Sequence, residues 1–383
     1  MRILNLYRKF LDKFDDPANH LLRVELDSTA LLSNISSFRN AYPNHKIAAV
    51  LKSNAYGHGL KEIGLALAEN NDIKYFAVDS IIEAEKLHDL GIKKPVIILG
   101  YIPRKVFYRL KRFSATPVIN SLEDAKYFSK AGFLLNAQIK LDTGMNRQGI
   151  KVSELKYALE ILARCKKINL TGLLTHLADA DGATPEGTLL QLQSWTDALK
   201  IFRDFKGNSA EFDLHFSASA ATKYLASAES NLIRAGIGIY GFNLASNPAL
   251  NLKPVLSFWA KLVNIKTAQK GEKIGYNFTF EADKKMRVGI LPCGYYEGLP
   301  RELSNQGFVY YGNQPLRILG RISMNLTAVD LTDAGEIKIE DDIEVYSSDL
   351  ARLNSIENAA RIANTIPYEI LVRINPGIRR YVK

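Results

Sequence analysis

The stretch YFAVDSIIEAEKLHDLGIKKPVIILG, residues 75–100, decides the fold class that the sequence predicts. Two short apolar runs, YFAVD (75–79) and VIILG (96–100), are typical of buried parallel strands. Between them, IIEAEKLHDLG (81–91) has helical spacing and ends in glycine, a common helix stop signal. The stretch therefore predicts a strand–helix–strand unit whose two strands are parallel.

The same alternation recurs along the first two thirds of the chain. A second helical segment, LEDAKYFSKAG (122–132), also ends in glycine and leads into another apolar run. Repetition of about eight such units predicts a (β/α)₈ barrel, with an open doubly wound sheet as the competing architecture. The predicted strands are IAAVLK (47–52), YFAVD (75–79), VIILG (96–100), ATPVI (115–119), AQIKLD (137–142), LTGLLTH (170–176), FDLHFS (212–217) and IRAGIG (233–238).

The pattern changes around residues 247–254. From Val255 onward apolar and polar residues alternate with period two, which predicts antiparallel strands with few helical stretches before about Ser355. We therefore predict an α/β fold with a barrel over residues 1–250 and a C-terminal β-rich domain over residues 251–383. Residues 1–20 form an N-terminal extension, predicted to be a short surface helix, with a membrane-surface role as the less favoured alternative.

Composition excludes several classes of protein. The 383 residues are 47% hydrophobic and 23% charged, which argues against a disordered chain, a collagen-like repeat or a membrane bundle. The net charge of +10 is compatible with acidic ligands, but Lys and Arg are dispersed and no nucleic-acid recognition motif is present. Cys165 and Cys293 are far apart and lack neighbours at metal-ligand spacing. We expect a cytoplasmic protein with no metal site and no transmembrane helix.

A lysine ends one of the predicted strands. In AAVLKSNAYGHG (48–59), the Lys52 amine would emerge at the C-terminal mouth of a barrel, where such enzymes carry out their chemistry. Lysine forms Schiff bases with aldehydes, and pyridoxal 5'-phosphate (PLP) is the usual aldehyde cofactor. A solvated lysine before a turn is the simpler alternative, and Lys52 taken alone favours it.

Polar residues follow other predicted strands as well. In KLDTGMNRQG (140–149), Lys140, Asp142 and Arg147 form either a carboxylate-binding group or a surface ion-pair cluster. The small residues of HFSASAAT (215–222) allow a phosphate to reach backbone N–H groups, or serve ordinary close packing. His176 closes another predicted strand and is either a structural histidine or, given that position, a catalytic one. Arg234 lies inside an apolar strand, where its partner would be a pyridine nitrogen or an acidic residue. Together, these polar residues at successive strand ends point to an active site more specifically than any one of them does alone.

These segments resemble the alanine racemase family, whose members use PLP to interconvert L- and D-alanine. The resemblance runs from about Leu22 to the C-terminus. It implies a barrel followed by a β domain, and a head-to-tail homodimer in which the partner's β domain completes each active site. It also implies a supply of D-alanine for cell-wall peptidoglycan. The matching fragments, in order, are AVLKSNAYGHG, KLDTGMNRQG, RAGIGIYG, GYYEGLPR and GRISMN.

The resemblance assigns roles by position. Lys52 would bind PLP as a Schiff base and act as one base, and Tyr276 of the other subunit would act as the base on the opposite face. Arg234 would contact the pyridine nitrogen, and His176 would link Arg234 with Tyr276 by hydrogen bonds. The positions that match the family's phosphate-binding residues are Tyr56, Ser219, Gly236, Ile237 and Tyr368.

Four further residues match positions around the substrate. Arg147 and the backbone of Met324 would bind the substrate carboxylate, and Tyr295 would line the entrance with Tyr368. Lys140 matches a lysine that can be carbamylated, which would supply a negative charge beside Arg147. Racemisation requires one base on each side of the substrate, the roles given to Lys52 and Tyr276, because a proton leaves one face of a planar carbanion and returns to the other.

The sequence departs from the family pattern at several places. Ala218 replaces the usual Asn before Ser219, Asn325 replaces the usual Asp after Met324, and Tyr296-Glu297 replaces Ala-Asp. Gly275-Tyr276-Asn277 stands in place of Ser-Tyr-Gly. These changes leave both predicted bases present and put rate and substrate range in question.

Other functions are compatible with parts of the sequence. The nearest is a racemase of the same fold acting on serine or on several amino acids. A PLP-dependent decarboxylase of similar architecture would usually carry a Cys-Glu-Ser-like motif, whereas Cys293 lies in LPCGYY. A PLP carrier built from the barrel alone would not explain Tyr276, Tyr295 and Met324 at family positions.

Overall fold

The computed structural model describes residues 20–207 and 212–383. Contacts divide the chain into two compact units. The barrel unit comprises Thr29–Ala55 and Ile63–Lys253, and the β-rich unit comprises the chain up to Ser28, Tyr56–Glu62 and Pro254–Lys383. The predicted surface helix of the N-terminal extension lies outside the described residues. Within those residues, no helix is both long and apolar enough to cross a membrane.

The barrel unit confirms the predicted fold class. In its described residues, eight parallel strands follow the order β10-β2-β3-β4-β5-β6-β8-β9, and each corresponds to one of the predicted apolar runs. The ends of this sheet approach each other at a parallel bridge between Ala218 and Arg234, which makes the barrel nearly closed. The strands are β2 (Lys46–Val50), β3 (Ile73–Val78), β4 (Val96–Ile98), β5 (Ala115–Ile119), β6 (Leu135–Asp142), β8 (Ile168–Leu174), β9 (Asp213–His215) and β10 (Leu232–Ala235), with β7 (Ile150–Lys151) beside the end of β6.

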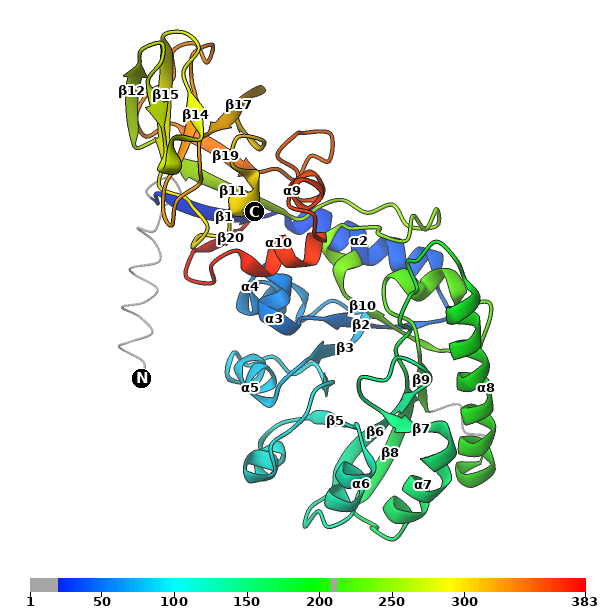
Figure 1. The fold of residues 1–383 in the computed structure, drawn as a ribbon. Coiled ribbons are helices and arrows are strands. Elements are labelled where there is room, and N and C mark those ends of the chain that lie inside the picture. Colours follow the sequence, from blue (N-terminus) through cyan, green and yellow to red (C-terminus); the bar gives the residue numbers. More distant parts are fainter. Residues whose placement is uncertain (1–19, 208–211) are drawn as a thin grey trace, which may run out of the picture. The chain divides into compact units, whose positions relative to one another are not determined.

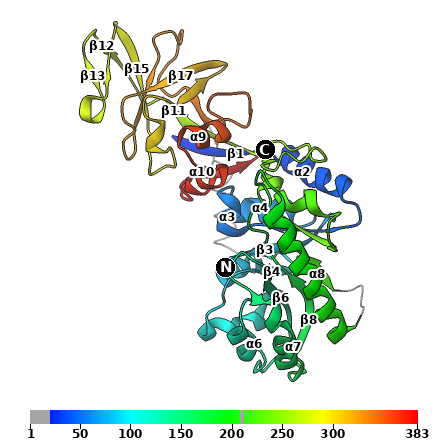
Figure 2. The same cartoon turned by 45° about the vertical axis from the view of Figure 1, so that its right-hand side comes forward.

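Helices connect these strands and cover the outside of the barrel (Figures 1 and 2). The helix of the deciding stretch is α5, which begins with a capping box between Ser80 and Glu83 and ends just before Gly91 at φ +79°. The helices that follow barrel strands are α4 (Leu60–Leu67), α5 (Ile81–Asp89), α6 (Leu122–Phe128), α7 (Leu155–Ala163) and α8 (Glu186–Lys206), with 3₁₀ segments η2 (Arg104–Arg112), η3 (Val152–Glu154), η4 (Ala220–Tyr224) and η5 (Ile237–Tyr240). The helix α2 (Ser28–Ala41) leads from β1 into β2.

The main sheet of the β-rich unit joins strands from both ends of the chain. Its order is β12-β15-β18-β17-β16-β19-β11-β1-β20, so β1 pairs antiparallel with β11 and parallel with β20. The alternating burial of β11 matches the period-two pattern that predicted it. Its strands are β1 (Leu22–Leu26), β11 (Leu256–Lys261), β12 (Asn264–Ala268), β15 (Met286–Leu291), β16 (Phe308–Tyr311), β17 (Gln314–Leu319), β18 (Thr327–Asp330), β19 (Asp342–Tyr346) and β20 (Arg380–Val382).

Shorter elements complete the β-rich unit. Strands β13 (Lys273–Ile274) and β14 (Phe280–Glu281) form a small hairpin around η6 (Tyr276–Phe278). The segment η7 (Arg301–Leu303) and the helices α9 (Ile356–Ile362) and α10 (Pro367–Arg373) follow along the chain. The predicted domain boundary at residues 250–251 stays a prediction, and the structure adds that β1 pairs with C-terminal strands.

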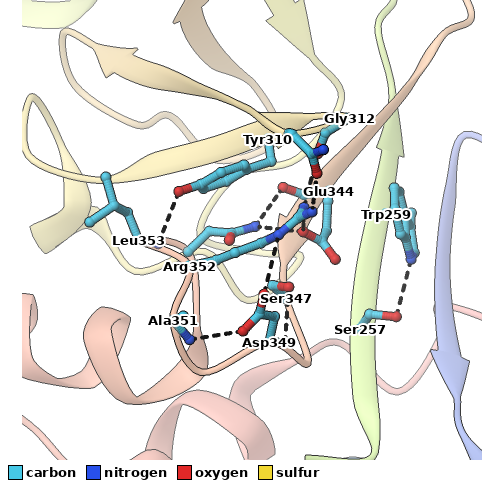
Figure 3. Close-up of polar contacts among 12 residues, drawn as sticks. Ser257, Trp259, Tyr310, Gly312, Glu344, Ser347, Asp349, Ala351, Arg352 and Leu353 are labelled. Carbon is cyan, nitrogen blue, oxygen red and sulfur yellow. Dashed lines mark hydrogen bonds and ion pairs between the residues drawn. The ribbon is translucent and has the colours of Figure 1, made fainter.

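Arg352 holds the loop between β19 and α9 against the β16–β17 hairpin (Figure 3). It donates to Glu344 Oε2 at 2.8 Å and to the Gly312 carbonyl oxygen at 3.0 Å, and its guanidinium lies 4.9 Å from the centre of the Tyr310 ring. The Tyr310 hydroxyl accepts the backbone N–H of Leu353 at 3.3 Å. These contacts of Arg352 and Tyr310 all lie within the β-rich unit and tie the loop to the hairpin, so their effect is to stabilise the loop.

Candidate active site

Charged residues gather at the carboxyl ends of the barrel strands. Lys52 directly follows the β2–Leu51 segment, Lys140 lies near the end of β6, and Arg147 follows in the loop after it. His176 lies two residues beyond β8, and Arg234 lies within β10. Parallel barrel strands bring their carboxyl ends to one face, where barrel enzymes place their active sites. The structure therefore brings together five residues that were predicted on four different strand segments.

The charges of this cluster act on one another and on the pKa of Lys140. Burial lowers the pKa of Lys140 to about 8, with further lowering from the charges of Arg234, Arg147 and Lys52 and an opposing effect from Asp79. An amine with this pKa is partly neutral near physiological pH. Lys140 Nζ donates to Gln148 Oε1 at 3.3 Å.

His176 responds to the same surroundings. Its burial lowers its pKa to about 3, and the charges of Arg234, Arg147, Lys140 and Lys52 contribute in the same direction. The imidazole is therefore neutral at physiological pH. A group of cations that suppresses the protonation of a neighbouring histidine is suited to bind an anionic ligand.

Arg234 is clamped in the barrel interior, where only 4% of its surface is exposed. Its Nη1 donates to His215 Nδ1 at 2.8 Å and to the His215 carbonyl oxygen at 2.9 Å. Its Nη2 donates to the Thr175 carbonyl oxygen at 2.8 Å and lies 3.3 Å from His176 Nδ1. Because a guanidinium can only donate, both imidazoles must accept at Nδ1 and hold their proton on Nε2.

Small residues form a narrow cradle beside Arg234. Ser219 Oγ accepts the backbone N–H of Gly236 at 2.9 Å and that of Gly238 at 3.1 Å. A Cβ added at Gly238 would lie 2.6 Å from Phe38 Cζ, so this position has no room for a side chain. Ile237 begins η5 between the two glycines. The N–H groups of Gly236 and Gly238 are thus already used by Ser219, and what this cradle offers a phosphate is a backbone without bulky side chains.

The chain leaves β2 through a left-handed turn. Ser53, Asn54, Ala55 and Tyr56 all have φ between 53° and 55°, although none is glycine. Such a conformation costs about 1–2 kcal/mol per residue, so the surrounding structure must hold it. Part of that support comes from Glu83, whose Oε1 accepts the Ser53 N–H at 2.7 Å. Retained strain directly after Lys52 is typical of functional sites.

Two of the predicted phosphate ligands are neighbours within the β-rich unit. The rings of Tyr56 and Tyr368 have centroids 5.8 Å apart. Arg380 donates to the Gly57 carbonyl oxygen from Nε at 3.2 Å and from Nη2 at 3.0 Å. Gly57 has φ +82°, and a Cβ there would lie only 2.0 Å from the Leu371 carbonyl oxygen. The loop that carries Tyr56 is thus held against α10 and β20.

Three other predicted residues share a cavity of about 520 Å³ in the β-rich unit. These are Tyr276, Tyr295 and Met324, and all three side chains are exposed. Arg301, Ile322 and Ser323 complete its lining. The structure therefore brings together the predicted second base, the predicted entrance residue and the predicted carboxylate ligand. Lys52 belongs to the barrel unit and Tyr276 to the β-rich unit.

Two of the sequence departures are in contact with each other. Asn325 Nδ2 donates to Glu297 Oε1 at 2.7 Å, and the other oxygen of Glu297 accepts the Gly294 N–H at 2.8 Å. Asn325 therefore supplies a donor to the Glu297 carboxylate, where the usual Asp would place a second acidic group. Ala218, a third departure, contributes the backbone bridge to Arg234.

Some polar residues of the barrel interior were missed by the sequence analysis. Gln138 and Asp213 are almost fully buried, and His215 was quoted only as the start of a small-residue segment. Gln138 precedes Lys140 by two residues and Asp213 precedes His215 by two, so strand alternation could have placed each pair on one face. The described residues contain no group of three His, Cys, Asp or Glu side chains fit to hold a metal ion.

Comparisons with known proteins identify the family. Residues 26–244 match the N-terminal domain of alanine racemase, and residues 255–382 match its C-terminal domain. The chain belongs to the alanine racemase family. The alanine racemase of Leptospira interrogans, strain Fiocruz L1-130, is 32% identical over 373 residues, covering 94% of this chain and 95% of the relative. That of Borreliella burgdorferi is 31% identical over 371 residues, covering 95% and 97%.

Solved structures of the family agree with the fold. The alanine racemase of Clostridium difficile 630 superposes with a TM-score of 0.88 at 26% identity, covering 95% of this chain and 96% of the other. The biosynthetic alanine racemase of Pseudomonas aeruginosa gives a TM-score of 0.83 at 30% identity, covering 95% and 99%. The predictions of the family, of the barrel with a β-rich domain, and of an enzyme of this family are confirmed.

Proposed function

We propose that the protein interconverts L- and D-alanine with PLP as cofactor. The observation that carries this proposal is the cluster of Lys52, Lys140, Arg147 and Arg234 around a neutral His176. A cofactor phosphate and a substrate carboxylate are the anions that would match it. The matched relatives named alanine racemase support the choice of substrate.

The residues of the barrel unit fit the proposed cofactor. Lys52 Nζ is the proposed point of covalent attachment, Arg234 the donor to the pyridine nitrogen, and Ser219, Gly236 and Ile237 the phosphate contacts. Ser219 and Ile237 line one small pocket, which supports the last of these. Tyr56 and Tyr368 keep their predicted role at the phosphate. When bound, PLP acidifies the Cα–H bond of an attached amino acid by withdrawing electrons.

Two side chains would move the proton. Lys52 Nζ would accept it on one face of the substrate carbon, and Tyr276 Oη on the other. We propose that Tyr276 comes from the second copy in a homodimer, together with Tyr295. In support, Tyr276 is 68% exposed and lines a cavity with Tyr295 and Met324. His176, with its proton on Nε2, would donate toward this tyrosine while Arg234 holds its Nδ1.

The substrate carboxylate would bind Arg147 and the backbone of Met324. Lys140 is the proposed carbamylation site beside Arg147, because its lowered pKa of about 8 leaves a neutral amine available to attack CO₂. An N–C bond then forms while one C=O π bond of CO₂ opens onto its oxygen, one proton leaves the nitrogen to solvent, and the product is a carbamate anion. A carbamate signal in ¹³C NMR after exposure to ¹³CO₂ is expected, and a wild-type spectrum no different from that of Lys140→Ala would disprove carbamylation.

The proposed function is tested by assaying the purified protein with added PLP for visible absorption and for racemisation of L-alanine. Comparison with L-serine and L-lysine decides between an alanine racemase and the alternative with broad specificity. Release of CO₂ from labelled substrate without racemisation would support the decarboxylase instead. Supply of D-alanine for peptidoglycan and a cytoplasmic location are part of the same proposal.

A further inference from the structure

A chain of buried polar side chains crosses the barrel interior and ends at Arg234. His215 accepts from Arg234 at Nδ1, and its Nε2 lies 2.9 Å from Gln138 Oε1. Gln138 Nε2 donates to Asp213 Oδ2 at 3.3 Å, and Lys46 Nζ donates to Asp213 Oδ1 at 2.7 Å. Gln138, Asp213 and His215 are each at most 2% exposed.

Strand alternation places these residues in line. Asp213 and His215 are two residues apart on β9 and face the same side, as do Gln138 and Lys140 on β6. Lys46 and Asp213 begin their strands, whereas Arg234 lies near the end of β10. The chain therefore runs from the amino ends of the strands toward the carboxyl ends, where the candidate active site lies.

The residues at the two ends of this series of side chains fix the direction of every hydrogen bond in it. Arg234 can only donate, and an ionised Asp213 held by Lys46 can only accept. The Gln138 amide must therefore turn its NH₂ toward Asp213 and its oxygen toward His215. That oxygen needs a donor, so the His215 proton belongs on Nε2. Burial, with the charges of Arg234 and Lys46, lowers the pKa of His215 well below its ordinary value, which agrees with a neutral ring.

We propose that Gln138 is a positioning residue for racemisation: through His215 it holds Arg234 as a fixed donor toward the pyridine nitrogen. The inference rests on the proposed function only for the role of Arg234. An arginine at that nitrogen resists its protonation and limits electron withdrawal by the ring, which disfavours transamination. Loss of the Gln138 oxygen leaves the His215 Nε2–H without that acceptor, so His215 and Arg234 are no longer held in one arrangement.

The hydrogen bond between His215 and Gln138 is tested on the protein without cofactor. Protein labelled with ¹⁵N-histidine should show His215 as a neutral imidazole protonated at Nε2, identified by its loss in His215→Asn. Gln138→Met, which keeps the length of the side chain but removes the acceptor, should give a shifted or exchange-broadened His215 signal. A wild-type His215 protonated at Nδ1 would overturn the inference, because that proton would face the Arg234 donor.

The functional part compares two products from L-alanine and PLP. In transamination the amino group moves to the cofactor, alanine is oxidised to pyruvate and the cofactor aldehyde is reduced to the amine, with no other reactant. Gln138→Met should raise pyruvate formed per racemisation by about tenfold, the equivalent of one buried hydrogen bond. Gln138→Glu should stay close to wild type, since two adjacent carboxyl groups share a proton and the new side chain still presents an oxygen to His215.

Thr171→Val is the matched control. Thr171, on β8, donates from Oγ1 to the Ala137 carbonyl oxygen of β6 at 3.3 Å, next to Gln138 in the sequence, but it makes none of the hydrogen bonds that link Arg234 to Lys46. It should change neither the His215 signal nor the product ratio. An unchanged ratio in Gln138→Met, or an equal rise in Thr171→Val, would overturn the inference. Absence of racemisation by the wild-type protein with PLP would instead overturn the proposed function.

Discussion

The barrel interior and the exposed cavity of the β-rich unit prepare their functional residues in different ways. In the barrel, Arg234 is buried and held by carbonyl oxygens and two imidazoles, so its position and charge are set by the fold. In the β-rich unit, Tyr276 and Met324 are 68% and 55% exposed. The first region is arranged within one chain, whereas the second presents aromatic and apolar groups that another surface can cover.

This difference suggests that the barrel unit binds the ligands, whereas the β-rich unit supplies residues that complete an active site. Buried cations cost much free energy unless a ligand or a partner compensates them, which fits a region that binds an anionic cofactor. Exposed tyrosines cost little and can be added to a site by association of a second copy. The predictions below test this contrast, beginning with the largest expected effect.

Replacement of Lys52 tests the barrel side directly. Lys52→Ala should abolish the visible absorption of bound PLP and lower the racemisation rate by at least 10²–10⁴-fold, roughly the contribution of one acid–base group. Absorption spectroscopy and a racemisation assay give the two readouts. Lys61→Ala, which removes an exposed lysine of α4, is the control and should retain both. Persistence of the absorption band in Lys52→Ala would show that another lysine holds the cofactor.

Replacement of Tyr276 tests the β-rich side. Tyr276→Phe should slow α-proton removal from L-alanine more than from D-alanine, by roughly 10²-fold or more. Its thermal stability should match wild type, because the side chain is mostly exposed. Proton exchange with each enantiomer in ²H₂O is the measurement.

The same variant tests the contribution of a second copy. Mixed Lys52→Ala and Tyr276→Phe proteins should recover partial activity through hybrid dimers, each with one intact site. Equal, mild effects on both enantiomers would contradict the two-base mechanism. Failure of the mixture to regain activity would place both bases in one subunit.

The contact between Asn325 and Glu297 predicts a smaller, conditional effect. Asn325→Asp should lower the free energy of unfolding by about 1–3 kcal/mol, because it loses a donor and faces the buried Glu297 carboxylate. Adding Glu297→Gln should restore much of the loss, since the new amide can donate to the aspartate. Denaturant unfolding of both single variants and the double variant measures the coupling. Additive losses would show that the two departures are independent.

The lowered pKa of His176 predicts an acid-dependent loss of stability. Its ordinary value is 6.5 and its folded value about 3, so between these pH values the unfolded chain binds the proton that the folded protein excludes. The free energy of unfolding should therefore fall with decreasing pH by up to about 1.4 kcal/mol per unit from this group. His176→Gln should show a shallower fall over pH 6.5–3 in denaturant titrations. An identical slope would mean that the fold does not keep His176 neutral over this pH range.

Local sequence pattern was sufficient to predict both architectures. Each of the eight apolar runs became a barrel strand, because short buried strands and glycine-terminated helices follow from hydrophobicity and turn chemistry over a few residues. The alternation after Val255 likewise predicted β11, β15 and β18. Pairing of β1 with β11 and β20 could not be predicted in this way, since LRVEL carries no signal for partners more than 200 residues away.

The candidate site was predicted in its residues but not in its contacts. Lys52, Arg147 and Arg234 stood out as charges at strand ends, and the family resemblance added Tyr276 and Met324. The acceptors that hold Arg234, the lowered pKa of Lys140 and the role suggested for Gln138 depend on which side chains meet across the barrel. None of these is a property of a single segment.

By itself the sequence determined the family, the succession of elements and the chemical groups available, because each is encoded in residue types and spacing along the chain. Only the tertiary structure decided which imidazole accepts from Arg234, which amide faces Asp213 and which backbone remains left-handed after Lys52. The physical reason is that proton position, hydrogen-bond direction and strain depend on burial and on distances across the barrel. Closing the sheet sets those distances, and local sequence does not.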